Sequence, residues 1–451
     1  MESLWREQTK KIIAKSGDEQ SADQNIHWDI IVVGAGMAGL LIAYYLKQKG
    51  KRVLVLEAAE IASGQTEGTT AKITSQHDLK YSKLIKKTSL KKARLYARAN
   101  EEAINEYERL IRKLEIECEF ERLSSYLYTR QDKKILWEEA QAAARLGIDA
   151  EFVREADLPF PVTGMVKFWN QAQFSPLKFA KGLAAELEIW EHTKVMKITG
   201  NCVVTHDKVL YADKIVVATH YPIRNVPGFY FLRQHQERSY VLALSGCKKI
   251  EGMYKGIDKD GLSLRQAGEY LLLGGAAHRT GKNRLGGTYL FLEKKAKEYY
   301  PECGVVARWS AQDCMPHDGI PFIGKYSIFT PNLYVATGFQ KWGMTSSMVA
   351  AMILRDELCG KKNPYSEVFR PQRLNVRAGI RKFLIDVGAS VMGLSKGIFH
   401  RNGPRCPHMG CELVWNPDEH SWDCPCHGSR FEEDGRLIDN PAKKSIRNSV
   451  L

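Results

Sequence analysis

Residues 28–57, WDIIVVGAGMAGLLIAYYLKQKGKRVLVLE, decide the fold of the N-terminal part of this 451-residue chain. Their pattern predicts a buried strand, a glycine turn, a helix and a second strand, which together form a βαβ unit. Gly34 permits the tight turn, Gly36 lets the backbone approach a pyrophosphate, and Gly39 lets the helix pack closely on the strand. Glu57 ends the second strand at the distance expected for an acid that binds ribose hydroxyls. The unit predicts a dinucleotide site for FAD or NAD, and the alternative is a glycine-rich turn without a ligand.

A second glycine- and threonine-rich segment distinguishes between the two cofactors. Residues 63–72, SGQTEGTTAK, resemble the segment that lines FAD in the D-amino-acid-oxidase-like flavoproteins. The resemblance continues in Gln173–Lys178, Ala212–Thr219, Trp309–Gly324 and Leu333–Thr345. It covers residues 28 to about 358 and implies an α/β fold, with an FAD-binding Rossmann-like domain of the glutathione-reductase type and an interleaved mixed-sheet substrate domain.

The resemblance also implies which residues hold FAD. The last matching stretch predicts a strand, a turn and a second helix start, whose backbone NH groups would point at the flavin ring. An ordinary strand–turn–helix crossover is the alternative for any one of its residues. The FAD-binding candidates are Gly34, Gly36, Met37, Ala38, Gly39, Glu57, Thr69, Thr70, Ala71, Lys72, Val195, Thr219, Gly338, Gly343, Met344 and Thr345.

The chain has no second GxGxxG in a strand–helix context. Reductases that take hydride from NAD(P)H normally carry a second dinucleotide domain. We therefore expect the electron donor to be a small organic molecule, an amine, amino acid or hydroxy acid, oxidised at a C–N or C–O centre as the resemblance implies. Arg238, Tyr240 and His278 are candidates to bind a carboxylate or to act as acid–base groups. Structural hydrogen bonding explains these three residues equally well.

The C-terminal part carries two cysteines and two histidines in two short motifs, Cys406-Pro-His408 and Cys424-Pro-Cys-His427. A single residue between two ligands suits ligands that reach two different metal atoms, whereas a zinc knuckle, the alternative, usually draws ligands two to four residues apart. In a Rieske [2Fe-2S] cluster two thiolates bind one iron and two imidazoles bind the other. The sequence resembles the Rieske family, which implies these four residues as cluster ligands and electron transfer as the task.

Four neighbouring residues complete or modify this resemblance. Cys411 and Cys426 match the positions at which high-potential members form a disulfide between the loops, and Ser429 matches their hydroxyl donor to a bridging sulfide. Phe431 stands where those members carry a tyrosine whose hydroxyl reaches a cysteine sulfur. Hydrogen bonds to cluster sulfurs favour the reduced state, so we expect a somewhat lower potential than theirs.

The C-terminal module is shorter than a usual Rieske domain. Only Ser395–Arg405 separates a helical stripe from the first ligand loop, which leaves most of the base sheet without sequence to form it. A core of roughly fifty residues needs a metal or covalent staple, so we expect the cluster, a disulfide and docking on the flavoprotein to stabilise it. The stripe within residues 371–399 is basic and amphipathic, and it either packs on its own protein or lies on an anionic membrane.

Composition limits the class of protein. With 44% hydrophobic and 26% charged residues, the chain has the composition of a globular protein of two or three domains. The polar opening lacks a secretory core and no run reaches the length of a membrane span, which favours the cytoplasm. The six cysteines scattered before residue 360 are expected to be core or inert thiols.

The net charge of +14 is unevenly distributed. Residues 401–451 hold seven Lys or Arg and eight Asp or Glu, a net of −1, which leaves +15 for the first 400 residues. No aromatic–basic recognition motif accompanies this surface, which argues against nucleic acid as a partner. Lysines such as those between Lys80 and Lys92 predict a solvated face, and an acidic redox partner or an anionic substrate is the alternative.

These observations predict an enzyme, an FAD-dependent oxidoreductase that oxidises a small organic substrate and passes electrons through FAD and a Rieske cluster to an unknown acceptor, a protein or a quinone. The alternatives are a redox carrier or sensor that exchanges electrons with proteins, and a membrane-docked dehydrogenase that reduces quinone. The expected parts are an N-terminal extension (1–27), the flavoprotein (28–360), an amphipathic linker (361–399) and the Rieske domain (400–451). Within the flavoprotein, the FAD-binding segments are about 28–94, 176–224 and 301–360, and the substrate-domain segments about 95–175 and 225–300.

Overall fold

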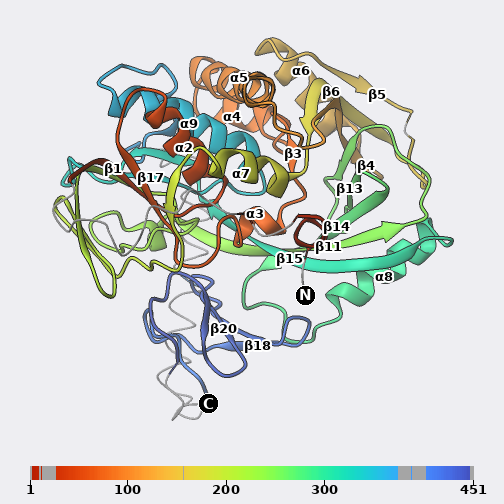
Figure 1. Cartoon of the computed structure of the whole chain (residues 1–451). Coiled ribbons are helices and arrows are strands. Elements are labelled where there is room, and N and C mark those ends of the chain that lie inside the picture. The colour runs from red at the N-terminus through yellow and green to blue at the C-terminus, as the bar shows by residue number, and fades with distance from the viewer. Residues whose placement is uncertain are drawn as a thin grey trace.

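The computed structural model describes residues 3–9, 12, 27–155, 157–373, 388 and 403–446. Most of the expected amphipathic stripe therefore lies outside the described residues. The described chain forms two large sheets with helices and one small C-terminal sheet (Figure 1). No helix in these ranges is both long and apolar enough to cross a membrane.

The first sheet contains the predicted βαβ unit. Its strand order is β16-β17-β10-β1-β2-β7, and the pairs among β17, β10, β1, β2 and β7 are parallel. The strands are β1 (His27–Val33), β2 (Val53–Leu56), β7 (Glu188–Trp190), β10 (Val209–Val217), β16 (Phe322–Lys325) and β17 (Leu333–Thr337), with β8 (Lys197–Thr199) and β9 (Cys202–Val204) at one side.

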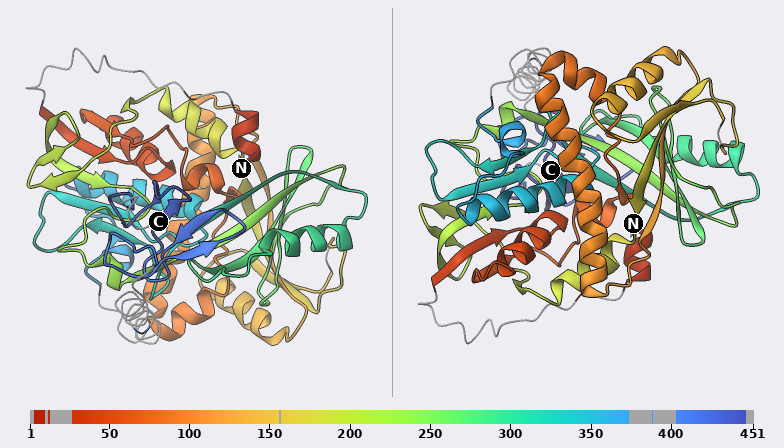
Figure 2. Two further views of the ribbon diagram at one scale, coloured as in Figure 1. Left: turned by 90° about the horizontal axis from the view of Figure 1, so that it is seen from below. Right: turned by 90° about the horizontal axis from the view of Figure 1, so that it is seen from above.

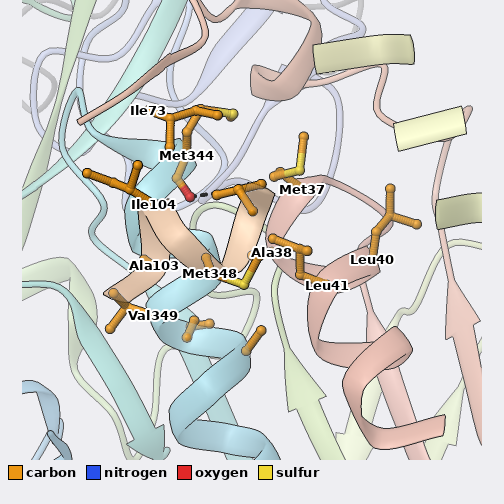
Figure 3. Packing of buried hydrophobic residues seen from close by; sticks show 14 of the residues in the cluster. Met37, Ala38, Leu40, Leu41, Ile73, Ala103, Ile104, Met344, Met348 and Val349 are labelled. Atoms are coloured by element: carbon orange, nitrogen blue, oxygen red, sulfur yellow. Dashed lines mark hydrogen bonds between the residues drawn. The ribbon is translucent and has the colours of Figure 1, made fainter. Parts of the chain in front are cut away.

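Both faces of this sheet are covered, as a parallel sheet requires. In β1, Ile30 and Val32 belong to the large core, while Ile31 and Val33 belong to a second core on the opposite face. Helices α2 (Met37–Lys47) and α9 (Gly343–Leu358) pack on the first of these faces together with α5 (Leu90–Leu114), where Ala38, Leu41 and Met348 lie close together (Figure 3). Seen from above, α5 runs between the two halves of the molecule (Figure 2).

The second sheet is mixed, with strand order β15-β11-β14-β13-β12-β4-β6-β3 and β5 paired to β6. Its strands are β3 (Lys72–Ile73), β4 (Glu121–Thr129), β5 (Ala150–Val153), β6 (Gly164–Gln173), β11 (Gln234–Ser245), β12 (Met253–Gly256), β13 (Ser263–Ala267), β14 (Tyr270–Arg279) and β15 (Gly304–Pro316). Because β15 pairs along β11, the expected FAD-binding segment 301–360 divides, and its first part up to Pro316 belongs to this sheet. The α/β fold with an interleaved mixed sheet is confirmed.

The strand β11 has two different faces, because successive side chains point to opposite sides of a sheet. Val241 and Ala243 belong to the large core on the side of the first sheet. Tyr240, Leu242 and Leu244 belong to a separate core on the other side, which is completed by α8 (Thr288–Tyr299). The other helices with described bounds are α1 (Leu4–Gln8), α3 (Gln65–Gly68), α4 (Tyr81–Lys87), α6 (Lys134–Arg145), α7 (Pro176–Ala184), α10 (Ser366–Phe369) and the 3₁₀ turn η1 (Tyr230–Leu232).

The C-terminal module is a four-stranded antiparallel meander, β18 (Val414–Asn416), β19 (Ser421–Asp423), β20 (Arg430–Glu432) and β21 (Leu437–Asp439). It lies below β11 and β15 in Figure 1. Its buried core consists of Cys406, Cys411, Leu413, Cys424, Cys426, Phe431, Ala442 and Ile446. Half of this core is cysteine, which agrees with the expectation of a small core that needs staples.

One expectation about the scattered cysteines is wrong. Cys247 and Cys303 form a disulfide across a sequence separation of 56 residues. The disulfide forms because β11 and β15 pair antiparallel, with Ser245 opposite Gly304. Cys247 follows Ser245 by two residues and Cys303 directly precedes Gly304, so this register brings the two thiols together. A pairing of this kind depends on strand register, which the spacing of single cysteines does not reveal.

Candidate functional site

The glycine turn after β1 is held closely between neighbouring backbones. Gly34 has a φ of +106°, and a Cβ atom there would lie 2.7 Å from the carbonyl oxygen of Ala218 at the end of β10. A Cβ atom at Gly39 would overlap the carbonyl oxygen of Gly34. Only glycine at these two positions lets β1, β10 and α2 approach so closely.

The predicted ribose-binding acid lies beside this turn. The Glu57 carboxylate accepts hydrogen bonds from the backbone NH groups of Ala35 (2.7 Å) and Ala59 (2.9 Å). The Thr66 hydroxyl, from the second glycine-rich segment, accepts one from the NH of Met37 at the start of α2 (2.9 Å). The structure thus brings together the two segments expected to bind the nucleotide, and it adds Thr66, which the sequence analysis did not select.

The other nucleotide candidates lie at several places around this centre. Thr69 accepts a hydrogen bond on its carbonyl oxygen from the indole NH of the buried Trp5 (2.7 Å). Lys72 points away to the second sheet, where its ammonium donates to the Tyr254 carbonyl (2.9 Å) and to Ser263. Val195 is buried in the core behind the first sheet, and the Thr219 hydroxyl donates to the Tyr221 carbonyl (2.8 Å). The FAD contacts of these residues remain predictions.

The expected second helix start is α9, which begins at Gly343. The first NH groups of a helix have no intrahelical acceptor, so Gly343, Met344 and Thr345 supply donors for a ligand. The Thr345 hydroxyl lies 3.0 Å from the ring of the buried His77, whose other nitrogen lies 2.7 Å from the Tyr96 hydroxyl. His77 therefore positions the Thr345 side chain at the start of α9. The sequence does not mark His77, because only the folded chain brings it to Thr345.

A group of charged side chains lies just before α9, on the face of the second sheet that turns toward the first. The Lys341 ammonium donates to the Ser239 hydroxyl (2.7 Å) and lies 3.5 Å from the carboxylates of both Asp313 and Glu237. Burial raises the pKa of Asp313 despite the nearby Lys341. Burial lowers the pKa of Lys341, but Asp313 and Glu237 outweigh it and raise the pKa above its usual value. We call these four residues the Lys341 group. No local motif marks it, because β11, β15 and the α9 turn each contribute to it.

The three residues predicted to bind substrate, Arg238, Tyr240 and His278, lie on the opposite face of the second sheet from the Lys341 group. Arg238 forms an ion pair with Glu419 of the C-terminal module, and the Tyr240 hydroxyl accepts from the Asn416 amide (3.3 Å). The His278 ring stacks on Tyr240 with centroids 5.5 Å apart. Arg238 and Tyr240 thus contact the module directly and His278 supports one of them, which favours a structural role over a catalytic one.

The two predicted cluster loops have the same backbone turn. The NH of Gly410 donates to the carbonyl of Cys406, and the NH of Gly428 donates to the carbonyl of Cys424, both at 2.9 Å. Both glycines have a positive φ, of 83° and 85°. The turns bring the two buried thiols of Cys406 and Cys424 close enough for Cys424 to lower the pKa of Cys406 to about 7.

The two histidines meet at the same place. The rings of His408 and His427 lie 5.0 Å apart between centroids and are nearly perpendicular. Within the described residues, Nδ1 of His408 is buried without a hydrogen-bond partner, while Nε2 lies 2.9 Å from the Asn225 amide. Cys411 and Cys426 form a disulfide that joins the loops, with Cα atoms 6.7 Å apart. Adjacent thiols, adjacent imidazoles and an unused Nδ1 fit a two-iron cluster, and the disulfide leaves Cys411 and Cys426 out of the ligand set.

The position of Phe431 gives a test of the predicted lowered potential. Phe431 is fully buried among the cluster cysteines. We expect Phe431→Tyr to raise the midpoint potential by about 60 mV, because a hydrogen bond that favours the reduced cluster by about 1.4 kcal/mol corresponds to 59 mV for one electron. An EPR-monitored redox titration measures this shift. Trp422→Phe, opposite Phe431 in the neighbouring strand, is the control for altered packing, and an unchanged potential in Phe431→Tyr would contradict the prediction.

The second sheet holds the second cluster loop directly. The Gln236 amide donates to the carbonyl of His427 (2.8 Å), and the Gln312 amide donates to the carbonyl of Gly428 (2.9 Å) and to the Gln236 side-chain oxygen (2.8 Å). The Arg279 guanidinium donates to the carbonyl of Cys426 (2.9 Å). These contacts meet the expectation that the module docks on the flavoprotein.

A short series of contacts connects this loop to the turn before α9. The Cys314 thiol lies 3.8 Å from the Gln236 side-chain oxygen and 3.6 Å from the carbonyl of His220. The Thr337 hydroxyl, at the end of β17, donates to the same carbonyl of His220. Gly338 follows directly, with a φ of +75°, and a Cβ atom there would lie 2.5 Å from Pro316. One side of the cluster loops therefore faces the segment in which the flavin ring is predicted.

Comparison with known proteins agrees with both halves of this site. Residues 29–357 match the family described as FAD dependent oxidoreductase, and residues 368–449 match the Rieske [2Fe-2S] domain. A Bacillus subtilis (strain 168) protein, YhfW, whose provisional name describes a Rieske 2Fe-2S iron-sulfur protein, is 34% identical over 94% of this chain and 93% of its own length. The same fold occurs in glycine oxidase from Geobacillus kaustophilus (TM-score 0.68, 17% identity, 77% of this chain and 99% of that chain) and in L-proline dehydrogenase from P. horikoshii (TM-score 0.64, 15% identity, 77% and 97%).

Proposed function

Because the chain belongs to the FAD-dependent oxidoreductase family and ends in a Rieske [2Fe-2S] domain, we propose that it dehydrogenates an amine or amino acid and passes the electrons through its own cluster to an external acceptor. FAD, when bound, accepts two electrons as hydride from a C–H bond, and the cluster moves one electron at a time. The observation that carries the proposal is the Lys341 group on the side of the second sheet that faces the FAD-binding segments.

The charges of the Lys341 group favour a substrate that carries both an ammonium and a carboxylate. Lys341 offers a cation for the carboxylate, and Glu237 and Asp313 offer anions for the ammonium. A carboxyl group whose pKa is raised, as burial does for Asp313, is suited to take the ammonium proton and leave the neutral amine that gives up hydride. A hydroxy acid would use only the cation.

The docking contacts support electron transfer within one chain. Gln236 and Gln312 hold the loop of His427, and Cys314 and the carbonyl of His220 connect this region to Thr337. The flavin and the cluster are therefore proposed to lie on either side of a single layer of strand residues. No separate carrier is needed between them.

Substitution of Lys341 tests the substrate site. We expect Lys341→Met to lower kcat/KM about 100-fold, because a lost charge-assisted hydrogen bond in a buried site costs about 1.5–3 kcal/mol and each 1.36 kcal/mol is tenfold in rate. The measurement is the anaerobic bleaching of the flavin by a panel of amines, amino acids and hydroxy acids, with FAD content and cluster EPR as loading controls.

The matched control is Lys362→Met, at an exposed lysine beyond the end of α9, which should bleach at the rate of the unmodified protein. Equal rates in Lys341→Met and the unmodified protein would contradict the substrate site. If no compound in the panel reduces the flavin while a protein donor does, the chain is a redox carrier instead.

A further inference from the structure

The two histidines predicted to bind iron have different surroundings. His427 is only 3% exposed and lies against the second sheet, where Gln236 binds its carbonyl. His408 is half-buried at the edge of the module, and the next residue, Met409, is 41% exposed. One histidine therefore faces the inside of the molecule and the other faces its surface.

The loop next to His408 carries exposed apolar side chains. On the loop 224–232, Val226 is 57% exposed, Phe229 45% and Leu232 40%. The Phe231 ring connects this loop to the cluster, since its centroid lies 6.2 Å from that of Phe229, 6.1 Å from that of His408 and 5.7 Å from that of His427. We call Met409 of the module and Val226, Phe229 and Leu232 of this loop the Met409 patch, because the Phe231–His408 and Asn225–His408 contacts place the loop beside the first cluster loop.

Positive charges border the Met409 patch. Arg224 lies in the same loop, and it is close enough to Lys443 to lower the pKa of that lysine further after burial has done so. Lys443 and Lys444 are both exposed and directly follow Ala442, whose backbone NH donates to the Ser429 hydroxyl (2.9 Å) next to the second cluster loop. Among the residues that the structure describes, no carboxylate forms an ion pair with Arg224, Lys443 or Lys444.

We propose that the Met409 patch docks an acidic one-electron carrier protein, and that electrons leave the cluster through the edge of His408. The inference rests on the proposed function only for the direction of electron flow. An apolar centre with Met and aromatic residues inside a charged rim is the composition of a protein–protein interface, and the uncompensated cations supply complementarity to an acidic partner and steer its approach. In each transfer one electron passes from the reduced cluster to the oxidised carrier, with no bond made and no proton moved.

The test uses chemically reduced holoprotein, so that it does not depend on any substrate. The protein is reduced with dithionite, freed of excess reductant and mixed anaerobically in a stopped-flow instrument with an acidic ferric c-type cytochrome, whose Met/His ligation gives a high potential. We expect fast cytochrome reduction at low salt that falls at least tenfold at high salt, because salt screens the attraction. A basic c-type cytochrome of similar potential should react slowly.

Variants locate the docking surface. We expect Lys443→Glu and Val226→Glu each to slow reduction of the acidic cytochrome about tenfold at low salt, while reduction of an uncharged water-soluble benzoquinone stays unchanged. Lys83→Glu, at an exposed lysine on α4, is the matched control and should have no effect. The unchanged quinone rate excludes a mere loss of the cluster or a shift of its potential.

Three results would overturn the proposal. The first is a rate of cytochrome reduction that does not depend on salt, and the second is a rate in Lys443→Glu and Val226→Glu equal to that of the Lys83→Glu control. The third is that these two variants lose binding to anionic phospholipid vesicles while their rate of cytochrome reduction stays unchanged. The last result would assign the patch to a membrane surface. If the cytochrome results hold but no amine bleaches the flavin, the substrate proposal fails and the docking proposal stands.

Discussion

The Cys424→Ser protein is expected to bind FAD normally and to lack the [2Fe-2S] cluster. A serine hydroxyl does not replace the thiolate that the iron requires. The core cluster of the described module has eight buried apolar residues, four of them cysteines, so we do not expect the disulfide and the docking contacts to hold the module without its metal. We therefore expect residues 403–446 to lose their amide-exchange protection together with the Rieske EPR signal. Hydrogen exchange and EPR on the same sample measure both effects.

Cys411→Ser is the matched control, since it breaks the disulfide and leaves the four predicted ligands in place. The bridge closes a loop of 15 residues, for which chain entropy gives about 3 kcal/mol of stabilisation. This variant should keep its cluster and unfold at lower denaturant concentration. Full exchange protection of residues 403–446 in Cys424→Ser would show that the module folds without metal.

Glu419→Gln is expected to weaken docking of the module by about 3–5 kcal/mol, the usual cost of breaking a buried ion pair from one side. The Glu419 carboxylate accepts from the guanidinium groups of Arg238 and Arg430 and from the Ser310 hydroxyl (2.9 Å). Its loss would leave Arg238 buried at the interface. Increased exchange in β11 and β18 and slower reduction of the cluster after flavin reduction are the measurements.

Glu419 also makes the docking of the module depend on pH. Burial alone would raise the pKa of Glu419, but Arg238 and Arg430 outweigh it and lower the pKa to about 2. A lowered pKa means that the stabilisation is complete above the ordinary pKa of about 4.3 for a glutamate and is lost as the pH falls toward 2. We expect the module to stay docked near pH 5 in the unmodified protein.

Asp434→Asn is the control for Glu419→Gln, because Asp434 pairs with Arg436 on the exposed surface of the same module. Exposed pairs contribute little, so exchange in β11 and β18 should not change. An effect in Asp434→Asn equal to that in Glu419→Gln would show that the net charge of the module, and not the buried pair, controls docking.

Short sequence patterns predict those parts of this molecule in which the residues that act together are also close in the sequence. The βαβ unit and the cluster loops are each defined within about 30 residues, because a turn, a helix start and a ligand pair need neighbouring positions. Lys341 and Glu237 lie on different elements about 100 residues apart, and no spacing reveals that they meet. The charge of Arg238 makes it a candidate for binding a carboxylate, but the sequence does not show which face of the sheet it occupies. The Cys247–Cys303 bridge was missed for the same reason, since it depends on how β11 and β15 are paired.

The two-sided strand β11 restricts how this protein can change during evolution. Odd-numbered residues such as Glu237 and Ser239 contact Lys341, and even-numbered residues such as Gln236 and Arg238 contact the module. Point substitutions can alter one set without the other. Insertion or deletion of a single residue before Gln236 would exchange the two sets along the whole strand. Relatives that keep both the Lys341 contacts and the module contacts should therefore vary in the residue types of β11 and not in its length.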